Sequence, residues 1–132
     1  MQGRKTSEEI SRWLAEELDH PYDDIFNTLV EDSKNIDLSD SILDGLRRLK
    51  DRYVLILVTD NMDSFERWTV PANREYFSIF DNIFNSAQSG LFKKDENCRI
   101  FRDYISQYSA EAGNCILIDD SSNNRNAFGE HV

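Results

Sequence analysis

One uninterrupted apolar run constrains the fold of this 132-residue chain more than any other feature of its sequence. Residues 53–58 read YVLILV, and Thr59 follows them directly. A run of this length with β-branched residues is typical of a strand that is covered on both faces, as strands of parallel sheets are. The run therefore predicts a buried strand of a parallel sheet that ends at Thr59.

Weaker patterns on either side of this strand predict alternating helices and strands. Apolar residues recur at helical spacing in several segments, and Ser or Asp residues that can cap a helix precede some of them. The segment 63–75 is only weakly helical, with a break at Pro71. We expect helices over residues 7–18, from 22 to about 32, from 39 or 40 to 49 and from 96 to 108, and further strands over 83–86 and 115–118.

This order of elements predicts an α/β fold. Residues 1–37 are expected to be entirely helical, whereas residues 38–132 alternate between helix and strand and form one compact unit. Alternation of this kind implies right-handed crossovers and a parallel sheet with helices on both faces.

Composition narrows the classes of function. A net charge of −10 argues against nucleic-acid binding, which requires clustered Lys and Arg, although a divalent cation would still allow an acidic protein to act on phosphate esters. Cys98 and Cys115 lack the spacing of a zinc or redox site, so we expect two buried free thiols. The sequence shows no secretory signal and no run of about 18 apolar residues, which favours a cytoplasmic protein without a membrane segment.

Polar residues follow each of the three predicted strands. Because ligands of open α/β sheets bind at the carboxyl ends of the strands, these residues are candidates for one site. The alternative for each, taken alone, is that it caps the next helix. The three groups are Thr59-Asp60-Asn61, Asn85-Ser86 and Asp119-Asp120-Ser121.

Three segments in this order resemble motifs II, III and IV of the haloacid-dehalogenase-like (HAD) hydrolase superfamily. They are VLILVTDN at 54–61, SAQSGLFKKD at 86–95 and CILIDDSSNN at 115–124. The resemblance covers roughly residues 20–132 and implies a partial HAD-like Rossmannoid sheet, with residues 1–37 as part of a helical cap.

The resemblance also implies a chemistry: Mg²⁺-dependent hydrolysis of a small phosphorylated metabolite, a phosphate monoester, through an aspartyl-phosphate. Thr59 would donate its hydroxyl to a phosphoryl oxygen, and Lys93, rather than Lys94, would offset negative charge. Asp120 would be the principal metal ligand, and Asp119 would assist it or hold the lysine. The implied catalytic residues are Thr59, Lys93 and Asp120, the implied phosphate-binding residues are Thr59, Asp60, Asn61 and Lys93, and the implied metal ligands are Asp120 and Asp119; Asn124 is a weaker candidate.

One part of the family pattern has no counterpart. The first motif is a strand followed by Asp-x-Asp-Gly, which supplies the nucleophile, and no such segment precedes Tyr53. We therefore expect the chain to be part of a longer parent phosphatase and to be inactive alone. Without the central strand, the sheet would have unpaired edges, which favours a homo-oligomer or a strained small sheet.

Two other functions fit parts of the pattern. The first is a noncatalytic metal- or phosphate-binding or assembly module derived from the same fold. The second is a receiver domain of two-component signalling, which also uses paired acids, a Thr and a Lys. There the acidic pair comes first in the chain, whereas here the order is Thr59, Lys93, Asp119-Asp120.

Overall fold

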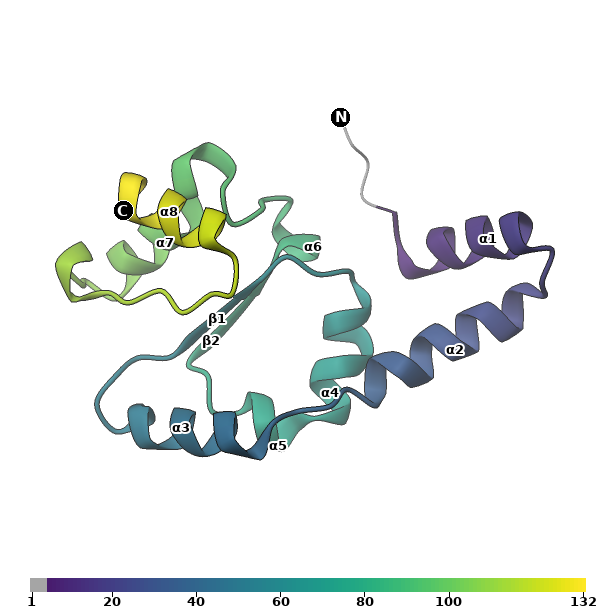
Figure 1. The fold of residues 1–132 in the computed structure, drawn as a ribbon, viewed down its shortest axis with the longest axis horizontal. Coiled ribbons are helices and arrows are strands. Elements are labelled where there is room, and N and C mark those ends of the chain that lie inside the picture. The colour runs from purple at the N-terminus through teal and green to yellow at the C-terminus, as the bar shows by residue number, and fades with distance from the viewer. Residues whose placement is uncertain (1–4) are drawn as a thin grey trace. The chain divides into compact units, whose positions relative to one another are not determined.

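A computed structural model describes residues 5–132 and divides the chain into two compact units, Met1–Ser89 (unit 1) and Gly90–Val132 (unit 2) (Figure 1). The described residues are mostly helical, with a small two-stranded parallel sheet in unit 1, so the predicted mixed α/β class is correct. Residues 1–4 of the predicted helical segment 1–37 lie outside the described residues. None of the helices formed by residues 5–132 has the length and apolar character needed to cross a membrane.

Unit 1 begins with a helical hairpin, in which α1 (Ser7–Leu18) packs against α2 (Tyr22–Lys34) (Figure 1). The Thr6 hydroxyl accepts a hydrogen bond from the backbone N–H of Glu9, whose carboxylate accepts one from the N–H of Thr6. This capping box fixes the start of α1. Asp19 ends the helix in the left-handed conformation, with φ of 48°. Both predicted helices are confirmed.

The sheet follows α3 (Asp40–Lys50) and pairs β1 (Ile56–Thr59) with β2 (Asn82–Asn85) in parallel. The last residues of the two strands, Thr59 and Asn85, lie opposite each other. Strand β1 starts later than predicted, because Tyr53 and Val54 are more than half exposed and remain outside the sheet.

Asp81 fixes the start of this sheet. Its carboxylate accepts the backbone N–H of Leu55 at 2.8 Å and pairs with the Lys50 ammonium at 2.7 Å. The Lys50 ammonium lowers the pKa of Asp81, and the Leu55 N–H adds to the effect. The end of α3 is thus tied to the beginning of both strands.

Short helices connect β1 to β2. Phe65, Phe77 and Phe84 form the buried core of this part, and the rings of Phe65 and Phe77 meet edge to face at 5.4 Å. Phe65 lies in a π-helical turn and Pro71 in the next helix, which explains the weak and interrupted helical pattern of this segment. The connecting elements are η1 (Phe65–Thr69), α4 (Val70–Ala72) and α5 (Arg74–Phe77), and α6 (Ser86–Ser89) follows β2.

Unit 2 consists of α7 (Asp95–Gln107), the short η2 (Ala112–Asn114) and α8 (Ser122–His131). Its core is small: Cys98, Ile100 and Phe101 are buried, and the Phe101 ring meets that of Phe128 edge to face at 5.2 Å. Residues 96–98 at the start of α7 adopt left-handed backbone angles, with φ from 50° to 61°. The Arg102 guanidinium stabilises this turn by donating to two of its carbonyl oxygens.

The predicted strand over residues 115–118 is wrong. The segment runs as a plain extended trace between α7 and α8 (Figure 1) and pairs with no strand of the described residues. Ile116 is 80% exposed and Ile118 82% exposed. A strand needs a hydrogen-bonded neighbour, and unit 2 offers none. Cys115, at the start of the segment, is only half-buried, so the expectation of a buried thiol holds for Cys98 alone.

Candidate functional site

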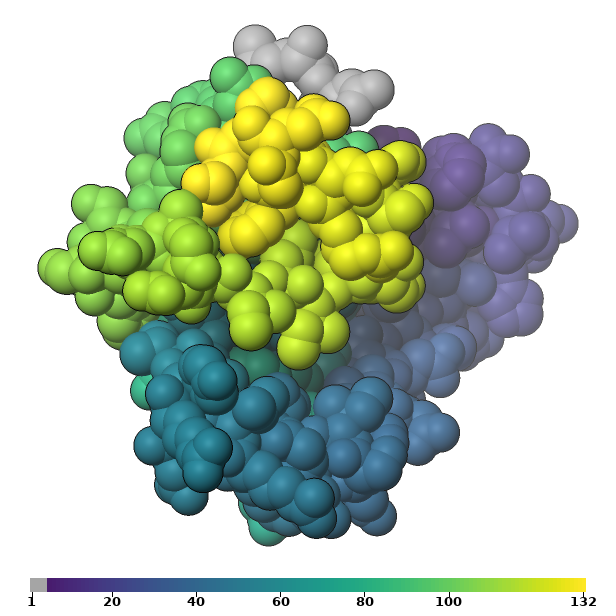
Figure 2. Space-filling view, turned by 60° about the vertical axis from the view of Figure 1, so that its left-hand side comes forward, coloured from purple at the N-terminus to yellow at the C-terminus, as the bar shows by residue number. Residues whose placement is uncertain are grey.

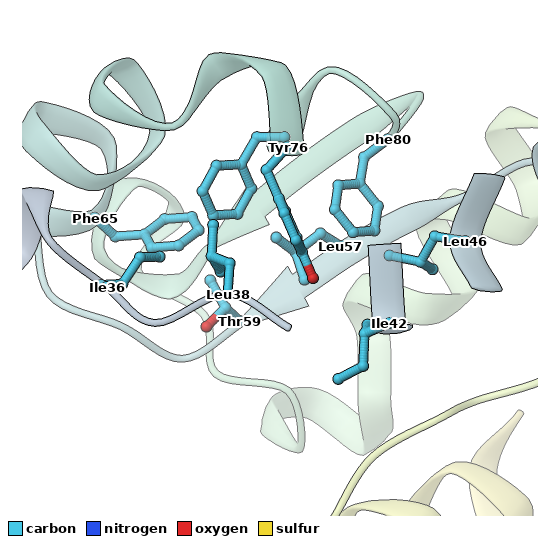
Figure 3. Close-up of a pocket in the computed structure, with 10 residues that line it drawn as sticks. Ile36, Leu38, Ile42, Leu46, Leu57, Thr59, Phe65, Tyr76 and Phe80 are labelled. Carbon is cyan, nitrogen blue, oxygen red and sulfur yellow. The ribbon is translucent and has the colours of Figure 1, made fainter. Parts of the chain in front are cut away.

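Thr59, the last residue of β1, lines a largely apolar pocket of about 310 Å³ in unit 1 (Figure 3). Side chains alternate along a strand, so Thr59 shares one face of β1 with Leu57, which also lines the pocket. The hydroxyls of Thr59 and Tyr76 are the polar groups among the lining side chains. The described lining residues are Ile36, Leu38, Ile42, Leu46, Leu57, Thr59, Phe65, Tyr76, Phe77 and Phe80.

In this pocket, the Thr59 hydroxyl is surrounded mainly by apolar side chains. None of its described lining residues is charged. A phosphoryl dianion placed there would lose hydration without gaining an opposite charge. Within unit 1, Thr59 therefore offers one hydrogen-bond donor and no charge compensation.

The loop after β1 is held by Asn85, a residue that is 1% exposed. Its amide oxygen accepts the backbone N–H of Asn61 at 2.9 Å, and its amide nitrogen donates to the carbonyl oxygen of Met62 at 2.9 Å and to the Glu66 carboxylate at 2.8 Å. The Asn61 side chain accepts the N–H of Met62. Both polar groups of Asn85 are thus used to shape the loop that contains Asp60 and Asn61.

The role of Asn85 was not predicted from the sequence, which placed it only among the polar residues at strand ends. A signal was present: Asn is rare inside strands, and it ends the apolar run Ile83-Phe84. Its buried amide requires partners, and backbone groups of the loop after the neighbouring strand supply them.

A second set of contacts joins α1 to the same loop. Ser7 is fully buried, and its hydroxyl and backbone N–H both donate to the Asp63 carboxylate, at 2.6 Å and 3.0 Å. Arg67 bridges Asp63 at 2.9 Å and Glu8 at 2.6 Å. The hydrogen bond from Arg67 lowers the pKa of Glu8 to about 2. Burial acts to raise the pKa of Asp63, but the hydrogen bonds from Ser7 and Arg67 outweigh it and lower that pKa.

In unit 2, Lys93 and Asp119 form an ion pair of 2.8 Å, with side chains 17% and 5% exposed. Asp119 also accepts the backbone N–H of Ser121 at 2.8 Å and the side-chain amide of Asn124 at 3.1 and 3.2 Å. Burial acts to raise the pKa of Asp119, but the hydrogen bonds from Lys93, Ser121 and Asn124 prevail and lower it. Asp119 is therefore a buried carboxylate that is ionised at neutral pH.

The structure separates the roles of the paired aspartates and of the paired lysines. Asp119 holds Lys93, which is one of the two roles that the resemblance implied for it, and Asp120 is exposed beside it. Lys94 stands instead at the N-cap position of α7. The Arg125 guanidinium donates to the backbone carbonyl of Asp119, a contact that the sequence did not predict.

The described carboxylates offer few ligands for a cation. Among residues 5–132, no cluster of three or more His, Cys, Asp or Glu side chains is close enough to hold a metal ion. Both carboxylate oxygens of Asp119 already accept hydrogen bonds, whereas the carboxylate of Asp120 reaches solvent. Mg²⁺ binds proteins through one or two carboxylates and keeps several waters. Asp120 would supply a single carboxylate ligand, and no cluster of such ligands lies around it among the described residues.

Comparison of the chain with protein-family models, with curated proteins and with solved structures found no match.

Proposed function

We propose that this chain carries the late part of a HAD-like phosphohydrolase site, in which unit 2 supplies the cation and the metal ligand. The observation that supports the proposal is the largely buried Lys93–Asp119 ion pair with Asp120 exposed next to it. Lys93 compensates negative charge on a phosphoryl group, Asp119 holds Lys93 in place, and Asp120 ligates Mg²⁺. The Mg²⁺ ion, when bound, neutralises the charge of the transferring group. The assignment of Thr59, Asp60 and Asn61 of unit 1 to phosphate binding rests on the sequence resemblance.

The proposed reaction is hydrolysis of the phosphate monoester of a small metabolite through an aspartyl-phosphate. The chain shown has no Asp-x-Asp-Gly segment before Tyr53 to supply the nucleophile. Lys93 and Asp120 can then bind and orient a phosphoryl group, but no described strand offers a carboxylate to attack it. We propose that the chain by itself binds Mg²⁺ and phosphate without turnover.

The test combines calorimetric titration of the chain with Mg²⁺ and inorganic phosphate and an assay with 4-nitrophenyl phosphate. We expect Mg²⁺ binding that Asp120→Asn abolishes and no hydrolysis above background. The matched control is Asp103→Asn, which removes an exposed carboxylate of α7 and leaves Asp119 and Asp120 untouched. If Asp120→Asn binds Mg²⁺ as tightly as the native chain does, the assignment of the metal ligand is wrong. Turnover that depends on Asp120 would disprove inactivity.

A noncatalytic assembly module is the second candidate, and the exposed Ile116 and Ile118 favour it. Large aliphatic side chains that alternate outward from an extended segment are typical of surfaces that other chains cover. Self-association without Mg²⁺ or phosphate binding would favour this candidate over the first.

A further inference from the structure

The loop after β1 (residues 60–63) is held from two sides within unit 1. On one side, the buried side chain of Asn85 bonds to backbone groups of the loop. On the other side, Ser7, the first helical residue of α1, donates its hydroxyl at 2.6 Å and its backbone N–H at 3.0 Å to one oxygen of the Asp63 carboxylate. Figure 1 shows the start of α1 beside the chain that leaves β1. The loop is thus fixed by one segment that precedes it in the sequence and one that follows it.

The contact with Asp63 also stabilises the helix. The first N–H groups of a helix have no partner within it, and the Asp63 carboxylate satisfies that of Ser7 from a loop 56 residues away in the sequence. A carboxylate at a helix N-terminus interacts favourably with the helix dipole, and hydrogen bonds to an ionised group are stronger than neutral ones. Asp63 therefore adds to the capping box that Thr6 and Glu9 form at the start of α1.

Asp63 and Arg67 form the direct polar link between α1 and the segment after β1. α1 packs along α2, as the purple and blue atoms at the right of Figure 2 show, and α2 in turn contacts η1. Among the described residues, the hydrogen bonds and ion pairs of α1 that reach beyond α2 all run from Ser7 and Glu8 to Asp63 and Arg67. The geometry of the loop and the start of α1 therefore depend on the same few bonds.

We propose that Ser7 and Asp63 form a latch through which α1 and the loop after β1 control each other's conformation. With the latch closed, Asp63 caps α1 and the loop is held from both sides. With the latch open, the Asp63 carboxylate keeps its bond from Arg67, and the loop is held from the Asn85 side only. Coupling between two sites is reciprocal, so a change that loosens the loop must loosen the start of α1, and the reverse.

The latch has a consequence for the proposed site. The loop contains Asp60 and Asn61, which the proposed function assigns to phosphate binding on the sequence resemblance. Control of the loop by α1 would make the binding of a phosphoryl group depend on the docking of this helix. This consequence rests on the proposed function, whereas the latch itself is tested without any ligand.

Amide hydrogen exchange of the full chain, followed by NMR, tests the latch from the side of the helix. Ser7→Ala removes the 2.6 Å bond to Asp63, and the reporter is the N–H of Asn61, which bonds to Asn85 and not to Ser7. We expect this N–H to exchange about fivefold faster than in the native chain, relative to the amides of β2. The control is Ser11→Ala, at a fully buried serine of α1 without a hydrogen-bond partner among the described residues, and it should leave the rate unchanged. No change in Ser7→Ala, or an equal change in both variants, would overturn the proposal.

The same measurement tests the reverse direction. Asp63→Ala removes the acceptor for Ser7, and the N–H of Ile10, which bonds to the Thr6 carbonyl in the first turn of α1, reports the effect. We expect its exchange to be about fivefold faster or more, again relative to the amides of β2. Asp63→Asn keeps an oxygen that can accept from Ser7 but loses the ion pair with Arg67, so Ile10 should be affected less. An unchanged rate in Asp63→Ala, or equal rates in the two Asp63 variants, would reject coupling through Ser7.

Discussion

Residues 53–58 of unit 1 and residues 115–118 of unit 2 are both apolar runs followed by polar residues, but the two runs have different structures. In unit 1 the apolar run forms β1, because β2 pairs with it residue by residue. In unit 2 the second run remains extended and unpaired among the described residues. A strand is thus a property of two neighbouring segments, and an apolar run supplies only one of them.

The two segments also differ in how their polar residues are held. After β1, the neutral side chain of Asn85 on the neighbouring strand fixes the backbone of Asn61 and Met62. After residues 115–118, the charged Lys93 fixes the side chain of Asp119. One loop is shaped through its backbone and the other through a carboxylate, so substitutions at Asn85 and Lys93 should act differently.

The largest effect is expected for Asn85→Ala. The substitution leaves the N–H of Asn61 and the carbonyl of Met62 without their buried partner and should lower the free energy of unfolding by about 3 kcal/mol. Urea denaturation measures the loss. The control is Asn82→Ala at the other end of β2, where the asparagine side chain is half-buried; a change of less than about 0.5 kcal/mol is expected there. Similar losses at both positions would show that Asn85 has no special role.

Lys93→Met should have the next largest effect. It leaves the carboxylate of Asp119, 5% exposed, without its cation and should destabilise unit 2 by about 2 kcal/mol. Because the folded-state pKa of Asp119 is lowered, the native pair stabilises the fold above the unfolded pKa of about 3.9 and this contribution is lost as the pH falls through the folded value. Hydrogen exchange of α7 and α8 reports the change. Lys94→Met should leave exchange unchanged, and equal effects of the two variants would exclude a specific role for the ion pair.

Much of the local structure could be predicted from the sequence. The apolar periodicity placed α1 and α3 within about a residue of their ends, and the resemblance to HAD motifs favoured Lys93 over Lys94. The sequence-based predictions fail where residues distant in the sequence determine the local structure. Residues 115–118 lack a neighbour, Asn85 finds its partners in another loop, and the left-handed turn at residues 96–98 depends on Arg102. Whether Thr59, Lys93 and Asp120 serve catalysis stays a prediction.

Ser7 and Ser11 of α1 in unit 1 are both fully buried, but only one of them has a hydrogen-bond partner. The Ser7 hydroxyl donates to Asp63, whereas the Ser11 hydroxyl has no hydrogen-bond partner among the described residues. Ser7→Ala should therefore cost about 1 kcal/mol, whereas Ser11→Ala should be neutral or slightly stabilising. Thermal denaturation of the two variants provides the measurement. A loss at Ser11 as large as that at Ser7 would indicate that packing and not the bond to Asp63 matters.

The smallest expected effect concerns the Glu8–Arg67 pair, which ties α1 to the segment after β1. Its side chains are 36% and 39% exposed, so solvent screens the interaction and a few tenths of a kcal/mol are expected. The pKa of Glu8 is lowered to about 2 from its ordinary value of 4.5, so the stabilisation is present above pH 4.5 and is lost as the pH falls toward 2. The difference in stability between the native chain and Glu8→Gln should shrink over that range. The control is Glu17→Gln, which removes an exposed carboxylate near the end of α1. If the two variants behave alike, the contact between α1 and Arg67 does not contribute, and the loop after β1 is held by Asn85 and Ser7 alone.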